Sequence, residues 1–190
     1  MNKKLILITI LIISIKLLLI KEISAQEKYF TRDATVSFFS STAMEDIKAI
    51  NSKVSCVLDI KSGKIEFAVL MKAFEFKKAL MEEHFNENYV ESSKFPKAIF
   101  IGQIENLYEI NFEKDGTYNA TIKGTMTIHG ESKEITTKGN IVVKNGNLIL
   151  KSEFNLSPED YSIEIPGVVR EKIAKELLIS LNAQLAPFNR

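Results

Sequence analysis

The sequence predicts an all-β fold of about eight antiparallel strands, arranged as a barrel or as a sandwich. Apolar and polar residues alternate with a period of two over most of the chain, which is the pattern of strands with one buried face. Short turn signals that contain glycine separate these runs. With 190 residues, 45% of them hydrophobic and 26% charged, the chain has the size and composition of one globular domain.

The first 25 residues have the pattern of a secretory signal peptide. Lys3 and Lys4 form a basic start, residues 5–20 are almost wholly Leu and Ile, and Ala25 is a small residue at the expected cleavage point. The alternative is a retained membrane anchor, but the apolar run has about 16 residues, fewer than the ~20 of a spanning helix. We therefore expect a cleaved signal peptide over residues 1–25 and one exported domain over residues 26–190, with no membrane span after cleavage.

Strands are predicted wherever the alternation is clear. The runs cover residues 64–69, 118–128, 135–143, 148–154 and 177–185. Residues 53–58 also look like a strand, in which Cys56 acts as a small buried hydrophobe; a reactive or intermolecular thiol is the alternative. Residues 41–52 show no clear period, so we expect a loop or a short helix there. Hairpin turns are predicted at Ser62-Gly63, Asp115-Gly116, His129-Gly130 and Asn145-Gly146, because Gly and Asn tolerate a positive φ.

Two segments depart from the strand pattern. Residues 76–88 place Phe76, Leu80, Met81, His84 and Phe85 at helical intervals, which predicts one short amphipathic helix. Residues 166–175 begin with a proline, which favours the first turn of a helix, and we expect a helical turn near the end of the sheet.

Composition and motifs exclude most kinds of chemistry. The net charge of +1 falls to about −2 without the first 25 residues, which gives no reason to expect nucleic acid as a partner. One cysteine and two histidines cannot build a disulfide framework or a zinc ribbon. Glu82-Glu83-His84 indicates a solvated helix face, and a metal site made by His84, His129 and a distant carboxylate is the alternative. We predict no catalytic residue, no metal site and no cofactor.

Three motifs, in order along the chain, resemble the YceI-like family. The stretch HFNENYVESSKFPKAIF, residues 84–100, is similar to the family's helix that ends in a His and an aromatic residue and runs into Lys94, Phe95, Pro96, Ala98 and Phe100. GTMTIHGESKEI, residues 124–135, is similar to its strand and turn. The third is a Phe-rich strand that leads to Asp160, Tyr161 and Ile163. Residues 35–62 depart from the pattern, so the resemblance is to a compact member.

The resemblance implies a lipocalin-like antiparallel β-barrel, exported to the periplasm, with a long apolar pocket that binds a polyisoprenoid or a similar lipid and performs no catalysis. Burial of an apolar chain at ~25 cal/mol per Å2 would supply several kcal/mol. Inward-facing residues that could form the pocket wall are Phe67, Val69, Tyr118, Ile122, Met126, Leu150 and Phe154. The same side chains could instead pack against one another as an ordinary core.

Three functions remain open from the sequence. The first is a periplasmic carrier that sequesters a polyisoprenoid, for example a quinone-type molecule. The second is a stress-response or protein-interaction module whose barrel is filled by side chains. The third is an enzyme that uses the cavity, which would need convergent buried polar groups. The sequence does not decide whether the protein is a homodimer.

Overall fold

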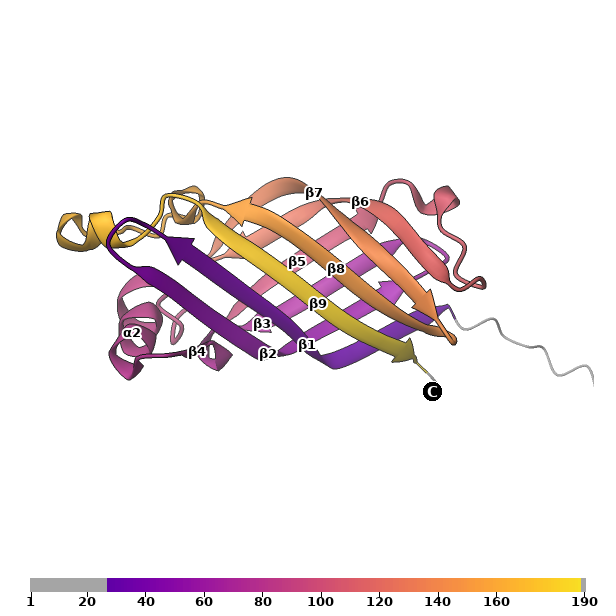
Figure 1. Ribbon diagram of the computed structural model, residues 1–190, viewed down its shortest axis with the longest axis horizontal. Coiled ribbons are helices and arrows are strands. Elements are labelled where there is room, and N and C mark those ends of the chain that lie inside the picture. The colour runs from indigo at the N-terminus through magenta and orange to yellow at the C-terminus, as the bar shows by residue number, and fades with distance from the viewer. Residues whose placement is uncertain (1–26, 189–190) are drawn as a thin grey trace, which may run out of the picture.

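A computed structural model describes residues 27–188, which form a closed antiparallel β-barrel (Figure 1). The expected signal peptide, residues 1–25, lies outside the described residues. The sheet order is β1-β9-β8-β7-β6-β5-β3-β2, and β1 pairs with β2 to close it, so the expected barrel is confirmed and the sandwich is excluded. The strands are β1 Lys28–Ser41, β2 Asp46–Asp59, β3 Lys64–Leu70, β5 Lys97–Ile104, β6 Gly116–Ile128, β7 Glu131–Lys144, β8 Asn147–Leu156 and β9 Leu177–Pro187. A two-residue strand, β4 (Glu75–Phe76), adds to β2.

Tight turns join several strands as the sequence predicts. His129 and Gly130 both have positive φ, as do Asn145 and Gly146, and these pairs turn β6 into β7 and β7 into β8. Gly63, also at positive φ, ends the turn between β2 and β3. The expected hairpin at residues 115–116 is wrong. Residues 105–115 form a long connection between β5 and β6, which contains the 3-10 helix η3 (Leu107–Glu109). Residues 115–116 are only the point where this connection enters β6.

The first two strands correct the expectation for residues 41–52. Only residues 42–45 form a turn, and β2 begins at Asp46. The period of two is present there, but a buried polar residue, Asn51, interrupts its apolar face. In β2, the residues that face the barrel interior have odd numbers up to Asn51 and even numbers from Val54 onwards. The Asn51 side chain supports this change of parity, since it accepts a hydrogen bond from the backbone N–H of Lys53 and donates one to the carbonyl of Leu70, both at 2.8 Å.

The expected helix over residues 76–88 is present with shifted bounds. It consists of α2 (Ala79–His84) and a π-helical turn, η2 (Phe85–Tyr89). Phe76 lies outside it because Phe76 pairs with Ala49 in the sheet. The turn expected near residues 166–175 is the 3-10 helix η5 (Gly167–Lys172), which follows Pro166. Two further 3-10 helices are η1 (Met71–Ala73) and η4 (Pro158–Tyr161). Within residues 27–188 no helix has the length and apolarity needed to cross a membrane.

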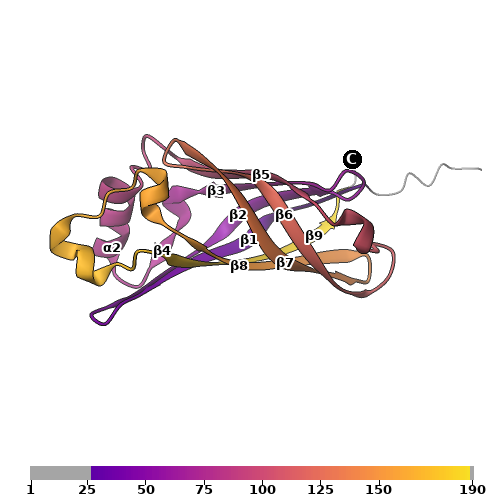
Figure 2. The ribbon, with the colours of Figure 1, turned by 90° about the horizontal axis from the view of Figure 1, so that it is seen from above.

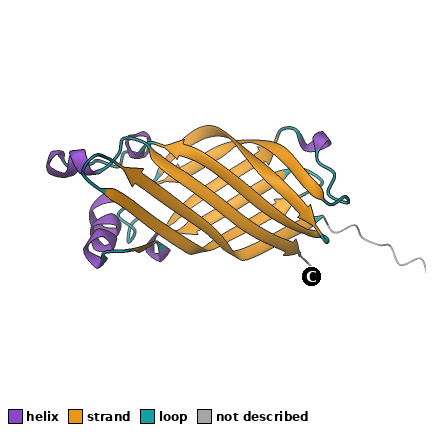
Figure 3. Cartoon of the chain, in the orientation of Figure 1, coloured by secondary structure: helices purple, strands orange, loops and turns teal. Residues whose placement is uncertain are grey.

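The two ends of the barrel differ (Figures 2 and 3). Helices α2 and η5 gather at the end where β1 turns into β2, which we call the mouth end (Figure 1). The other end, which we call the closed end, carries the C-terminal end of β9 and the connection with η3. A cluster of buried side chains fills the closed end: Tyr29, Leu58, Ile110, Val143, Leu148 and Leu185.

Candidate functional site: an apolar cavity inside the barrel

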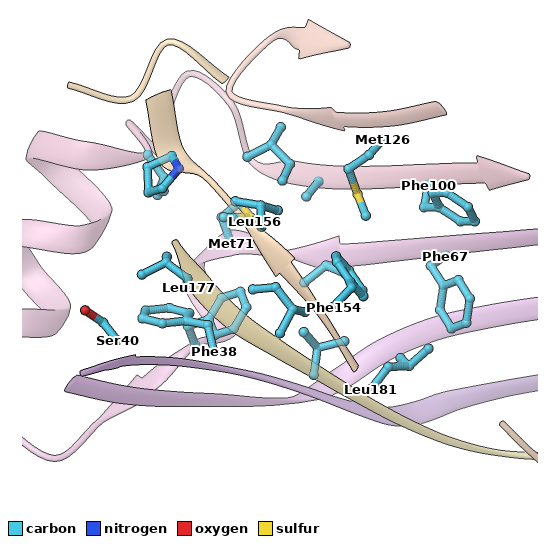
Figure 4. Close-up of a pocket in the computed structure, with 18 of the residues that line it drawn as sticks. Phe38, Ser40, Phe67, Met71, Phe100, Met126, Phe154, Leu156, Leu177 and Leu181 are labelled. Carbon is cyan, nitrogen blue, oxygen red and sulfur yellow. The ribbon is translucent and has the colours of Figure 1, made fainter. Parts of the chain in front are cut away.

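A cavity of about 570 Å3 occupies the barrel between the mouth end and the closed-end cluster. Its lining extends from Lys78 and Lys172 at the mouth end to Ile65, Ile104 and Leu150 deep in the barrel. Figure 4 shows the side chains of Phe67, Phe100, Met126, Phe154 and Leu181 directed into the space that the strands enclose. The barrel is therefore not filled by its own side chains, which argues against the alternative of a filled barrel.

Glycines in the wall allow one large ring to lie against the sheet. Gly102 of β5 and Gly124 of β6 are paired neighbours, and the Phe100 ring lies over both. A Cβ atom at Gly102 would be 2.6 Å from the Phe100 ring, and one at Gly124 would be 2.7 Å from it. Because both positions lack a Cβ, the ring rests on the wall and leaves the middle of the barrel free.

Small residues continue this wall on the next pair of strands. Ala120 of β6 and Gly139 of β7 are paired, and both line the cavity. At Gly139 a Cβ atom would lie 2.5 Å from the carbonyl oxygen of Lys151, so the close approach of β8 to β7 requires glycine here. The cavity thus arises where the inward side chains of β5, β6 and β7 are short or lie flat.

Strand pairing between β7 and β8 is incomplete at the mouth end. β7 pairs with β6 along nearly its whole length but with β8 only from Gly139 to Lys144. The last residues of β8 pair only with β9. Ile135 and Thr137 line the cavity on the β7 side of this divergence, and Phe154 lines it on the β8 side. The side chains of Thr137 and Ser152 bond each other at 3.1 Å where the two strands separate.

An aromatic cluster holds the helical segment over the mouth. The ring of Phe85 in η2 packs against those of Phe38, Phe74 and Phe76, with centroid distances between 5.1 and 5.6 Å. Phe38 also packs against Phe74 and Phe76. These contacts join β1, β4 and η2, so the helical segment is anchored to the barrel by apolar packing.

Most charged residues that line the cavity lie at its rim, and Lys151, an exposed residue within β8, is the exception. The Nζ atom of Lys78, just before α2, lies 2.7 Å from Oε1 of Glu45 in the β1–β2 turn. This hydrogen bond lowers the pKa of the Glu45 carboxyl, and the charges of Lys78 and Lys172 act in the same direction against a partial burial that raises it. Lys172 belongs to η5. Three separate segments of the mouth end therefore meet around one ionised carboxylate.

Six of the seven expected wall residues line the cavity. These are Phe67, Val69, Ile122, Met126, Leu150 and Phe154. Tyr118 does not line it: its hydroxyl donates to the carbonyl oxygen of Lys114 at 2.9 Å, and its ring packs near the closed end. The role of all seven as ligand contacts stays a prediction.

Sequence reasoning missed other parts of the lining. Phe38 lies in β1, in a region where no family motif was found, although its alternation with Val36 and Ser40 was a usable signal. Met71 and Phe74 lie in and just after η1, where no strand or helix period exists. Leu181 lies in β9, a strand that was predicted correctly without being assigned to a pocket.

Of the two histidines in the chain, His129 has structural partners. His129 Nε2 lies 2.8 Å from Glu91 Oε2, its Nδ1 lies 3.2 Å from the carbonyl oxygen of Tyr161, and its ring packs edge-on against Phe95. His84 lies instead at the cavity mouth. Among residues 27–188, no three His, Cys, Asp or Glu side chains are grouped so that they could hold a metal ion. Cys56 is fully buried, and this burial raises the pKa of its thiol.

Comparisons with known proteins agree with this architecture. A family model described as the YceI-like domain matches residues 28–185. A polyisoprenoid binding domain from Saccharophagus degradans, implicated in plant cell wall breakdown, superposes with a TM-score of 0.75 at 11% identity, over 85% of this chain and 99% of that one. BcnA of Burkholderia cenocepacia has a TM-score of 0.66 at 13% identity, over 80% and 96%. The YceI protein of Campylobacter jejuni has a TM-score of 0.54 at 16% identity, over 74% and 84%. No curated protein matches the sequence. At these identities the structural likeness shows the fold alone.

Proposed function

We propose that this chain, which belongs to the YceI-like domain family, binds a polyisoprenoid or a similar apolar lipid in its barrel cavity and carries it without catalysis. The observation that carries the proposal is a 570 Å3 cavity whose wall is built almost entirely from aliphatic and aromatic side chains. This volume falls within the range of about 300–1,000 Å3 that is usual for small-molecule sites. The Saccharophagus degradans domain with the same fold is described as polyisoprenoid binding, which supports the choice of ligand.

The chemistry of the wall favours a flexible, branched hydrocarbon. Met71, Met81 and Met126 line the cavity, and methionine side chains adapt to irregular apolar shapes. Burial of each CH2 group contributes roughly 0.8 kcal/mol, so an isoprene unit of about five carbons contributes up to ~4 kcal/mol. Two or three buried units would therefore exceed the lower estimates of the cost of association, about 4 kcal/mol.

Native mass spectrometry of the domain, residues 26–190, purified without detergent, tests the proposal. We expect an adduct that is released on denaturation and fragments as an isoprenoid, or uptake of added farnesol or an isoprenoid quinone by protein that carries none. An unmodified mass together with no uptake of these compounds would contradict binding in the cavity. The same spectra distinguish a monomer from a homodimer.

The proposal places the protein in the periplasm, after removal of residues 1–25. Cell fractionation followed by mass measurement of the intact chain tests this location. We expect a periplasmic species that begins at Gln26. A full-length chain in the membrane fraction would show a retained anchor instead.

A further inference from the structure

The rim of the cavity concentrates the charged groups of an otherwise apolar site. Glu45 comes from the β1–β2 turn, Lys78 from the residue before α2, Lys172 from η5, and His84 from the end of α2. All four line the cavity. The deeper wall that faces the lumen is made mainly by apolar residues such as Phe67, with the uncharged polar residues Thr137, Asn140 and Ser152 where β7 and β8 separate.

Glu45 supplies the one carboxylate among these four residues. Its side chain is only 23% exposed, whereas that of Lys78 is 62% exposed. The turn that carries it is fixed, because the backbone N–H of Glu45 donates to Oγ1 of Thr42 at 3.2 Å and the backbone N–H of Thr42 donates to the carbonyl oxygen of Glu45. Lys172 acts on the same carboxylate from the opposite segment. Among the residues that line the rim, two ammonium groups, of Lys78 and Lys172, therefore stand against one carboxylate.

An amphiphile with a charged head that inserts its chain into this cavity should leave the head at the rim, because burial of an unpaired charge against the mainly apolar deep wall is costly. We infer that the rim is a headgroup subsite for an acidic group, a phosphate or a carboxylate, held between Lys78 and Lys172 in competition with Glu45. This inference rests on the proposed function, because it assumes that the chain of the ligand lies in the cavity. A neutral head gains nothing from the two ammonium groups, so the subsite selects among ligands with the same chain.

Matched ligands test the subsite. Farnesol, farnesyl monophosphate and farnesoic acid have the same hydrocarbon chain with a neutral, a phosphate and a carboxylate head. We expect the two acidic ligands to bind about 2- to 5-fold tighter than farnesol at low ionic strength, as partly exposed charge pairs usually contribute. This preference should decrease in 0.5 M salt, which screens exposed charges. A preference for only one of the acids identifies which head the subsite accepts.

Variants assign the preference to the rim. Lys172→Ala and Lys78→Ala should each reduce the ratio of the affinity for an acidic ligand to the affinity for farnesol, measured on the same variant. Glu45→Gln should increase the preference, because it removes the competing carboxylate. Lys64→Ala is the matched control, since Lys64 is an exposed lysine at the start of β3, at the closed end, and should behave as the unmodified protein.

Each outcome separates this inference from the proposed function. Equal affinity for farnesol and both acids would overturn the subsite and leave chain binding intact. A preference that persists in both lysine variants would also overturn it, since another group would then be responsible. Failure of all three ligands to bind would contradict the proposed function itself.

Discussion

Replacement of Ala120 by phenylalanine should block the deep part of the cavity without unfolding the barrel. Ala120 is 2% exposed and lines the cavity, so its methyl group faces the lumen. Its partner on the neighbouring strand, Gly139, has no side chain and also lines the cavity. A phenyl ring at this position extends into existing free space. We therefore expect a stability loss below about 2 kcal/mol, towards the low end of the cost of overpacking in a dense core.

The loss of affinity follows from the volume that the ring takes up. A phenyl ring displaces roughly one isoprene unit, and about five carbon groups at ~0.8 kcal/mol each set an upper limit of ~4 kcal/mol. If half of that unit stays buried, the loss is about 2 kcal/mol. We therefore expect farnesol affinity to decrease by about 30- to 700-fold.

Competition against a fluorescent farnesol analogue measures this change, with circular dichroism and thermal unfolding as tests of folding. Thr125→Phe is the matched control, because Thr125 lies on the same strand, β6, but is exposed on the outside of the barrel. Its affinity should equal that of the unmodified protein. If the folded Ala120→Phe protein binds farnesol with unchanged affinity, the ligand does not lie in this cavity and the reasoning above is refuted.

Three further predictions concern the barrel that surrounds the cavity. Asn51→Ala should lower the free energy of unfolding by about 2–4 kcal/mol in urea titrations, because it removes a buried amide that bonds two part-buried backbone groups, the N–H of Lys53 and the carbonyl of Leu70. A loss below 0.5 kcal/mol would mean that water replaces the amide. Gly124→Ala should destabilise by at least ~2 kcal/mol in the same assay, since its Cβ would lie 2.5 Å from the Cα of Gly102; unchanged stability would show that β5 and β6 can separate without cost. Cys56 should resist iodoacetamide until the protein is denatured, because burial raises the pKa of its thiol. Because this pKa lies above that of the thiol in the unfolded chain, the protonated thiol contributes to the free energy of unfolding at neutral pH. This contribution should decrease as the pH rises past about 8.5, where the thiol of the unfolded chain ionises. Urea titrations at several pH values measure the decrease.

The alternation of apolar and polar residues predicts five strands because these strands are regular along their inward faces. In β6 the residues at even positions, from Ala120 to Ile128, all point inward. β2 departs from this rule, because the inward face changes from odd to even positions after Asn51. A buried asparagine looks like a loop residue in a sequence, and only its two backbone partners show that it belongs to a strand. Such partners are distant in sequence, so residues 41–52 could not be assigned from the chain alone.

The alternation of apolar and polar residues also does not show where along the barrel axis an inward-facing residue lies. Tyr118, Ala120 and Met126 share the inward face of β6, yet Tyr118 packs towards the closed end while Met126 lines the cavity. Their surroundings differ because different segments cover the two ends of the barrel. The connection of residues 105–115 buries Ile110 in the closed-end cluster, and the helical segment lies at the mouth end. A connecting segment has no period that reveals which end it fills.

The boundary between core and cavity therefore falls within a single strand, close to Ala120, which shares a hydrophobic core with the closed-end cluster and also lines the cavity. On the closed-end side of this residue, a larger side chain has no free volume and must displace its neighbours. On the mouth side, it takes up volume that a ligand would otherwise fill. Substitutions along one face of β6 should consequently change from affecting mainly stability to affecting mainly affinity as they move from Tyr118 to Met126. That transition would locate the floor of the binding site from solution measurements alone.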